Sequence, residues 1–143
     1  MSQYSIANMN NLEKIVWNAI DCKTDYYPIY LHGQNVSITF GENVISIPTD
    51  LCRGCGTQSE FIIPDSVKYI QKAAFSDNLN VTNIILGKNV EYIGECAIYN
   101  TSITSIILPK SLKKICSSGI SGSKLQYVEY QGTVQEWNAV EKE

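Results

Sequence analysis

Residues 61–70 read Phe61-Ile62-Ile63-Pro64-Asp65-Ser66-Val67-Lys68-Tyr69-Ile70, and the triplet that opens this stretch recurs along almost the whole chain. Each copy has an apolar residue, then any residue, then another apolar residue. The copies lie 22 or 23 residues apart and begin at Ile15, Ile38, Phe61, Ile84, Ile106 and Val128. A unit this short cannot bury its own apolar side chains, so successive copies must stack as the coils of a solenoid.

Further apolar positions follow each triplet at the same spacing, and we expect their side chains to fill the interior of the stack. The sixth residue after the start of a triplet is Val44, Val67, Val90, Leu112 or Val134. The ninth is Ile47, Ile70, Ile93, Ile115 or Trp137, and the fourteenth is Ile29, Cys52, Phe75, Ile98 or Ile120. Three residues before the triplet lie Leu12, Val81, Ile103 and Leu125.

One repeated position is small and polar instead. The fifth residue after the start of each triplet is Asn43, Ser66, Asn89, Ser111 or Thr133. Such side chains can hydrogen-bond backbone groups that are left unpaired where a strand ends. We therefore expect a row of polar contacts from coil to coil.

These positions resemble the leucine-rich repeat, whose skeleton is matched by Ile103-x-x-Ile106-x-Leu108-x-x-Ser111. Ile63-Pro64-Asp65-Ser66-Val67-x-x-Ile70-x-x-Ala73-Ala74-Phe75 is more specific and resembles the BspA-type, or Treponema-type, leucine-rich repeat. The resemblance covers roughly residues 12–138. The signature of that repeat reads Ile-Pro-x-Ser-Val-x-x-Ile-Gly-x-x-Ala-Phe. A later copy here, Ile93-Gly94-x-Cys96-Ala97-Ile98, keeps its glycine and alanine but lacks its phenylalanine.

The repeat and the resemblance together predict a β-rich leucine-rich-repeat solenoid. We expect about six coils of 22–23 residues, one curved parallel sheet, short extended or 3₁₀ segments opposite it, and at most a little helix near the N-terminus. Residues 1–143 then form a single domain. Residues 1–36 are a degenerate N-terminal capping coil, and residues 126–143 are a C-terminal capping coil, as solenoids often have.

Charge argues against a nucleic-acid partner. The net charge is −3, and the 11 lysine and arginine residues are scattered, whereas phosphate binding needs clustered basic side chains. The local group Lys110-x-x-Lys113-Lys114 is more typical of a solvated turn than of a binding patch.

The N-terminus has neither the basic segment nor the apolar segment of a signal peptide. No stretch is apolar for the roughly 18 residues that a membrane span needs. Members of the resembled family are often exported or attached to the cell surface. The sequence as given therefore favours a cytoplasmic or phage-associated protein, or a surface-exposed one from which an export signal has been removed.

Cys52-Arg53-Gly54-Cys55 has the two-cysteine spacing of many redox and metal sites, and it is the strongest candidate for such chemistry in this sequence. A zinc site would need a second pair of ligands at suitable spacing, whereas Cys22, Cys96 and Cys116 occur singly. The repeat offers a structural alternative, because Cys52 occupies a core position and Cys55 aligns with a row of small polar residues. A redox pair or disulfide and a zinc ligand set remain the other interpretations.

No pattern for catalysis stands out. The single histidine, His32, lies in the least regular coil, and the acidic residues fall mostly on expected turns. No glycine-rich stretch continues as a phosphate-binding loop. We therefore expect no catalytic residues, no cofactor and no metal.

The outward side of the strands carries the feature that folding explains least. Alternate strand residues point to opposite faces, so the middle residue of each triplet should face outward on the concave surface. These residues are Val16, Thr39, Ile62, Ile85, Ile107 and Glu129. A polar flank precedes them, comprising Lys14, Ser37, Glu60, Asn83, Ser105 and Tyr127.

An apolar stripe within a polar rim is typical of a protein-binding surface. The other interpretation is that β-branched residues simply suit a parallel sheet. We predict a protein- or peptide-binding site at Val16, Thr39, Ile62, Ile85, Ile107, Tyr127 and Glu129. The alternative function is a structural element in which the stripe, or one end of the solenoid, packs against another copy or a larger complex.

Overall fold

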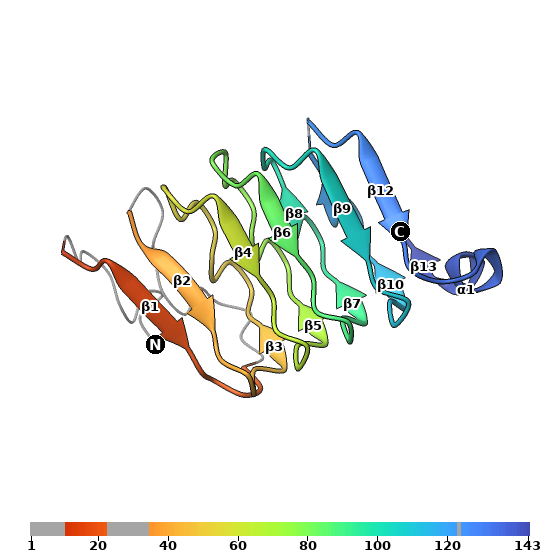
Figure 1. The fold of residues 1–143 in the computed structure, drawn as a ribbon, viewed down its shortest axis with the longest axis horizontal. Coiled ribbons are helices and arrows are strands. Elements are labelled where there is room, and N and C mark those ends of the chain that lie inside the picture. The colour runs from red at the N-terminus through yellow and green to blue at the C-terminus, as the bar shows by residue number, and fades with distance from the viewer. Residues whose placement is uncertain (1–10, 23–34, 123) are drawn as a thin grey trace.

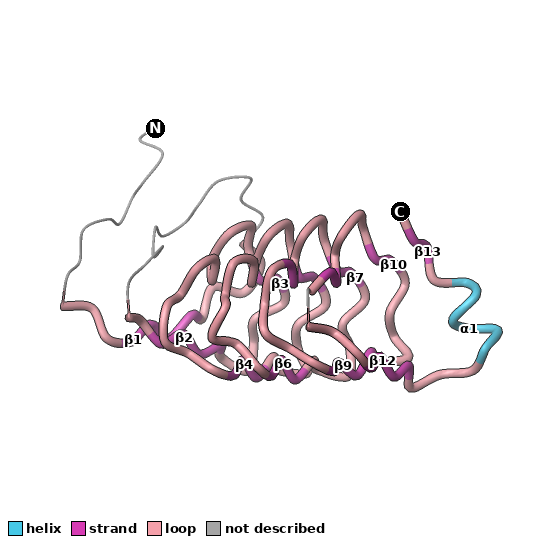
Figure 2. The backbone as a smooth tube through the Cα atoms, turned by 90° about the horizontal axis from the view of Figure 1, so that it is seen from above, coloured by secondary structure: helices cyan, strands magenta, loops and turns pink. Residues whose placement is uncertain are grey.

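The computed structural model describes residues 11–22, 35–122 and 124–143, whose short strands are wound into a parallel β-solenoid (Figure 1). The coils stack in a row along the long axis of the molecule (Figure 2). This confirms the predicted fold class. Ile29, His32 and much of the expected first coil lie outside the described residues.

The triplets form the strands of one side of the solenoid (Figure 1). In the described ranges these strands are β1 (Lys14–Trp17), β2 (Ser37–Phe40), β4 (Glu60–Ile62), β6 (Asn83–Ile85), β9 (Ser105–Leu108) and β12 (Tyr127–Tyr130). Parallel pairing joins β1 to β2, β4 to β6 and β9 to β12. Instead of one continuous ladder, the described strands therefore form three pairs, with open junctions between β2 and β4 and between β6 and β9.

A second sheet of two-residue strands holds the coils together elsewhere. Its parallel strands follow the order β3 (Ser46–Ile47), β5 (Tyr69–Ile70), β7 (Tyr92–Ile93), β10 (Lys114–Ile115) and β13 (Glu141–Lys142). A further pair joins β8 (Ile98–Tyr99) to β11 (Ile120–Ser121). These are the short extended segments that the sequence predicts, and the ladder of the five-stranded sheet is continuous.

Apolar residues at the repeated inward positions form one core. The buried side chains include Val44, Val67, Val90 and Leu112 from one position and Ile47, Ile70 and Ile93 from another. Phe40, Phe61 and Phe75 pack together, with 4.7 Å between the ring centroids of Phe61 and Phe75. Burying each such side chain contributes roughly 1.5–3 kcal/mol to folding, so the stack is held mainly by this core.

The small polar residues link neighbouring coils as predicted. Ser66 Oγ donates to the Val44 carbonyl at 2.7 Å, and Ser111 Oγ donates to the Val90 carbonyl at 2.7 Å. The Asn89 amide donates to the Asp65 carbonyl at 2.8 Å. These contacts satisfy backbone groups in the turns that follow β2, β4 and β6.

A left-handed residue occurs at the same place in successive coils. Twelve residues after the start of each triplet, Asp50, Ala73, Cys96 and Ser118 have φ angles of 57°, 50°, 52° and 54°. The backbone at this turn bonds to the next coil, since the Ala73 N–H donates to the Glu95 carbonyl at 2.9 Å. Stacking therefore holds side-chain-bearing residues in a region that favours glycine.

The C-terminal coil departs from the prediction. Its short helix, α1 (Val134–Ala139), has a capping box formed by Thr133 and Glu136 and buries none of its residues. Val128 and Val134 are expected in the core but are 47% and 72% exposed, because the chain leaves the stack as this helix. The sequence leads us to expect at most a little helix near the N-terminus, whereas the helix of the described residues lies at the C-terminus.

Asn78→Ala is expected to destabilise the protein by about 3 kcal/mol. The buried Asn78 amide accepts a hydrogen bond from the Cys55 N–H at 2.8 Å and donates to the Cys52 carbonyl at 2.7 Å. Alanine would leave these buried backbone groups without partners. Urea denaturation measures the effect. Asn89→Ala is the matched control, and an equal loss in both variants would contradict this account.

Candidate functional site

The outward triplet residues lie where the sequence places them. Ile62, Ile85 and Ile107 are 62%, 47% and 49% exposed, whereas their neighbour Ile84 is only 3% exposed. Val16, Thr39 and Glu129 are also exposed on the same side. The alternation follows from the strand geometry, in which successive side chains point to opposite faces. We call this outward surface of the triplet strands the strand face.

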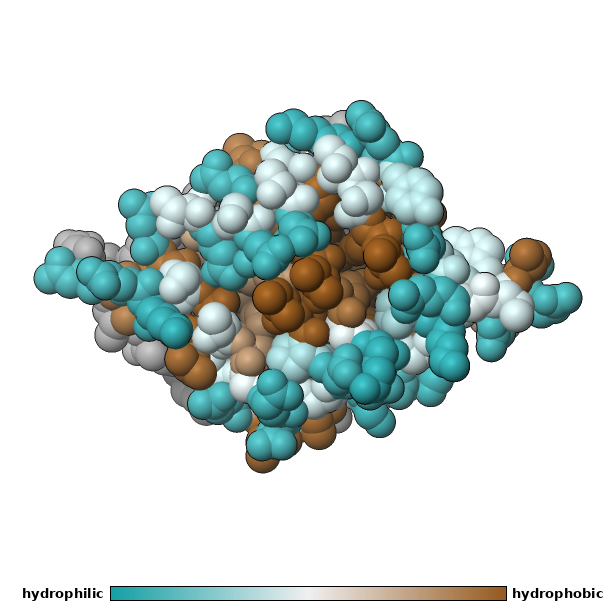
Figure 3. All heavy atoms as spheres, in the orientation of Figure 1, coloured by the Kyte–Doolittle hydropathy of each residue, from teal (hydrophilic) through white to brown (hydrophobic). Residues whose placement is uncertain are grey.

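Three isoleucines form the centre of the strand face. Ile62 lies opposite Ile85 in the β4–β6 pair, and Ile107 follows on β9. Figure 3 shows hydrophobic side chains gathered at the middle of this face and hydrophilic ones around them. We name Ile62, Ile85 and Ile107 the isoleucine stripe.

Polar residues border the stripe and are partly bonded to one another. Asn83 Nδ2 donates to Glu60 Oε2 at 2.6 Å. At the C-terminal end, Tyr127 Oη donates to Glu129 Oε2 at 3.2 Å, and this hydrogen bond raises the pKa of the Tyr127 hydroxyl. Tyr127 and Glu129 therefore form a polar pair beside the stripe, while Val16 and Thr39 lie toward its other end on β1 and β2.

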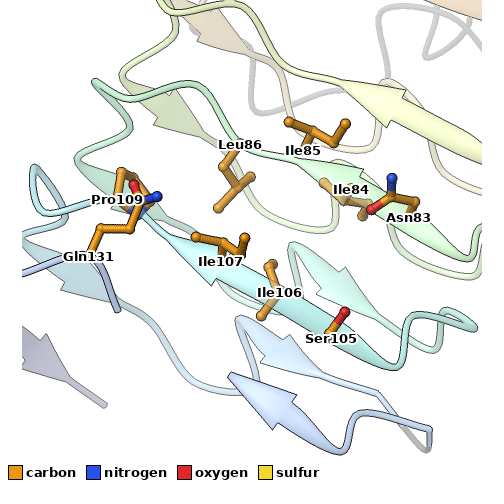
Figure 4. A pocket seen from close by; sticks show the side chains of 9 residues that line it. All are labelled: Asn83, Ile84, Ile85, Leu86, Ser105, Ile106, Ile107, Pro109 and Gln131. Carbon is orange, nitrogen blue, oxygen red and sulfur yellow. The ribbon is translucent and has the colours of Figure 1, made fainter. Parts of the chain in front are cut away.

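A groove between β6 and β9 is not predicted from the sequence. It has a volume of about 210 Å³ and reaches between the strands to the buried residues Ile84 and Ile106. Figure 4 shows Ile85, Leu86 and Ile107 around it, with Pro109 and Gln131 at one end. Pro109 is the signal that could have indicated it, because a proline at the end of a strand cannot donate to a neighbouring strand.

The cysteine motif belongs to the core. Cys52 and Cys55 are both buried and free. Burial raises the pKa of the Cys52 thiol, and a hydrogen bond with Cys55 adds to the effect. A thiol in such surroundings is poorly nucleophilic. The described residues hold no group of three histidine, cysteine or acidic side chains that could bind a metal ion.

Several acidic residues are engaged in ion pairs between coils. Glu91 contacts Lys113 at 2.6 Å and Lys68 at 3.7 Å, and Lys72 contacts Glu95 at 2.7 Å. Lys113, from the basic group noted in the sequence, is thus a surface partner of an acid in the preceding coil. Each exposed pair contributes little to stability, about 0–1 kcal/mol.

Comparison with known families agrees with this architecture. The model of the BspA type leucine-rich repeat region matches residues 30–139 in six copies. The chain belongs to this family of leucine-rich repeat proteins. No helix in the described ranges is long and apolar enough to cross a membrane.

A solved structure shares the fold. It is a leucine rich cell surface protein from Faecalibacterium prausnitzii A2-165, with a TM-score of 0.50 and 21% identity. The match covers 71% of this chain and 33% of that one, so this chain spans about a third of that protein's length. No curated protein matches the sequence.

Cys52→Val should fold with a stability within about 1 kcal/mol of the parent protein, because a small apolar side chain still fills the buried position. Thermal unfolding observed by circular dichroism, together with metal analysis of the purified protein, checks this. A stoichiometric metal that disappears along with the fold would contradict a purely structural role for Cys52.

Ile84→Thr and Ile85→Thr should differ sharply in stability. The first buries a hydroxyl and loses core packing, so it should destabilise the protein by about 2 kcal/mol or more. The second changes an exposed side chain and keeps β-branching, so its effect should stay within about 0.5 kcal/mol. Urea denaturation of both variants measures the difference, and equal losses would mean that the assigned faces are reversed.

Proposed function

We propose that this protein is a non-catalytic interaction module that binds a protein or peptide on its strand face. The observation that carries the proposal is the isoleucine stripe. Three aliphatic side chains, each about half exposed, lie side by side inside a polar rim. This composition resembles an interface core with its rim. Membership in the leucine-rich repeat family supports the proposal, since such repeats commonly serve protein interaction.

The groove beside the stripe gives this surface a recess that a partner side chain could enter. Because it descends between Ile85 and Ile107 to buried core residues, a partner side chain inserted there would lose most of its contact with water. Well-packed, desolvated contacts of this kind dominate binding energies at interfaces. Tyr127 and Glu129 extend the surface with polar contacts at one end, and Val16 and Thr39 extend it at the other.

A binding role also agrees with the state of the ionisable groups. Glu91 and Glu95 pair with lysines of neighbouring coils, and the Cys52 thiol is buried. The ion pairs join neighbouring coils and the thiol fills the core, so we assign these groups a structural role and not a catalytic one. We therefore propose that the protein acts without catalysis or a cofactor.

The proposal is tested by selecting peptides from a displayed random library on the immobilised protein. Titration calorimetry of a selected peptide should then show Ile85→Thr weakening binding by roughly 5- to 30-fold, equivalent to about 1–2 kcal/mol for a central apolar contact. Tyr99→Ser is the matched control, because Tyr99 is similarly exposed but lies on β8, outside the triplet strands. Peptides that bind both variants equally well would contradict the proposal.

Self-association is the second candidate, and a specific observation favours it. At the C-terminal end, Val128, Val134 and Trp137 line an apolar hollow of about 370 Å³ together with Tyr130. An exposed end of a solenoid core can pack against a second copy. Light scattering after size-exclusion chromatography would then show an oligomer, and Val134→Ser should shift it toward the monomer. A monodisperse monomer would exclude this candidate.

A further inference from the structure

The junction between β6 and β9 leaves backbone groups without partners. In the β4–β6 pair, the Asn83 N–H donates to the Ser59 carbonyl at 3.3 Å and the Ile63 N–H donates to the Ile85 carbonyl at 2.9 Å. Alternate residues of a parallel strand bond to opposite neighbours. The N–H and C=O of Ile84 therefore point toward β9, yet no backbone hydrogen bond joins β6 to β9 in the described part of the chain.

The edge of β9 that faces β6 also has backbone groups without hydrogen-bond partners among the described residues. This strand bonds to β12, and the Gln131 N–H donates to the Leu108 carbonyl at 2.9 Å. By the same alternation, the backbone groups of Ser105 and Ile107 point toward β6. Both walls of the groove thus carry hydrogen-bonding groups, and the apolar side chains of Ile85 and Ile107 lie at its mouth (Figure 4).

A proline accompanies each open junction. Pro64 comes after β4 and Pro109 after β9, at the position where β2 is followed by Gly41 and β12 by Gln131. The Gly41 N–H donates to the Trp17 carbonyl at 3.0 Å, and this bond extends the β1–β2 ladder. Proline has no N–H to donate, so it cannot extend the ladder toward the preceding coil.

The protein fills the other open junction with its own side chain. At β2–β4, Gln58 Oε1 accepts from the Ile38 N–H at 2.7 Å, and Gln58 Nε2 donates to the Ile38 carbonyl at 3.1 Å. One primary carboxamide thereby satisfies both backbone groups of Ile38, as a peptide group of a paired strand would. In the repeat, Ile38 and Ile84 occupy the same position two coils apart.

The corresponding position before β9 cannot supply such a group. Gln58 lies three residues before its triplet, where the β9 coil has the buried, apolar Ile103. The groove of about 210 Å³ is nonetheless large enough for a side chain, because protein cavities of about 150 Å³ bind benzene. The β6–β9 junction therefore has the hydrogen-bonding groups of the filled junction and space for an outside ligand.

We propose that this junction binds the primary carboxamide of a glutamine or asparagine side chain from an extended peptide. The carboxamide oxygen accepts from the Ile84 N–H and its NH₂ group donates to the Ile84 carbonyl, as Gln58 does to Ile38. Leucine side chains two residues before and after the glutamine point to the same face of an extended peptide and cover the isoleucine stripe. This rests on the proposed peptide-binding function and specifies its ligand. A carboxylate is rejected because it accepts but cannot donate, and because burying its charge is costly.

The test uses three peptides that differ in one side chain: N-acetyl-Leu-Ala-Gln-Ala-Leu-N-methylamide and its Glu and Met counterparts, in which both leucines share the face of the central residue. Each is titrated into the ¹⁵N-labelled protein. The Gln peptide should shift the amide signals of Ile84, Ser105 and Ile107 and bind roughly 10-fold more tightly than the other two, the scale of satisfying buried backbone groups. Equal binding of all three, or shifts away from these amides, would overturn the proposal.

Two proline variants provide matched controls. Pro109→Gln restores the donor that Gln131 supplies in the next coil, so it should close the junction and weaken the Gln peptide roughly 10-fold. Pro64→Gln makes the same change at the junction that Gln58 already fills, so binding should not change. Equal effects of both variants would overturn the proposal. If Pro109→Gln does not fold, the three-peptide comparison on the unchanged protein decides.

The experiments distinguish failure of the carboxamide proposal from failure of the proposed peptide-binding function. If library-selected peptides lose affinity with Ile85→Thr while the Gln, Glu and Met peptides bind alike, the strand face is a binding site without carboxamide specificity. If Ile85→Thr has no effect on any selected peptide, the strand face itself is not the site.

Discussion

The structure depends on stacking equivalent residues of successive coils at the spacing of hydrogen-bonded strands, about 4.8 Å. At that distance a polar side chain at an inward position would contact apolar neighbours on both sides, so most of these positions are apolar, and the polar Gln58 hydrogen-bonds the backbone instead. The same spacing brings the backbone of each coil into reach of the next one. Ile47, Ile70 and Ile93 illustrate the first requirement, and the continuous β3-β5-β7-β10-β13 ladder illustrates the second.

This constraint explains why so much could be predicted from the sequence. A 22–23-residue period specifies which residues are neighbours, and the period of two within a strand specifies which of them face inward. Ile84 and Ile85 are adjacent and chemically identical, yet the pattern assigns one to the core and the other to the surface, as the structure has them. The outward positions of the candidate site are predicted by the same reasoning, whereas their role in binding is not.

Features that depend on backbone geometry could not be predicted in this way. The left-handed turn holds Asp50, Ala73, Cys96 and Ser118, and none of these is the glycine that would have indicated it. The open junctions arise from hydrogen bonds that are not formed, and apolar periodicity carries no information about these. Only Pro64, Pro109 and the polar Gln58, whose position is apolar in the later coils, indicated them. Val128 was misplaced because its burial depends on the course of the chain after β12, where α1 leaves the stack.

The uneven pairing of the two sheets has a mechanical consequence. The five-stranded ladder links β7 to β10 and so crosses the level at which β6 and β9 are unpaired. At this level the coils are therefore joined by strand pairing on the side of the five-stranded sheet and are unpaired on the strand face. Bending about the five-stranded sheet breaks no hydrogen bond between β6 and β9 themselves, but it stretches the bond that the Ser102 N–H donates to the Val81 carbonyl at 2.9 Å. Twisting or sliding the coils would also strain the β7–β10 and β8–β11 pairs. Opening of the strand face at this level is therefore opposed by core packing and by the Ser102–Val81 bond, and not by a ladder between the two strands.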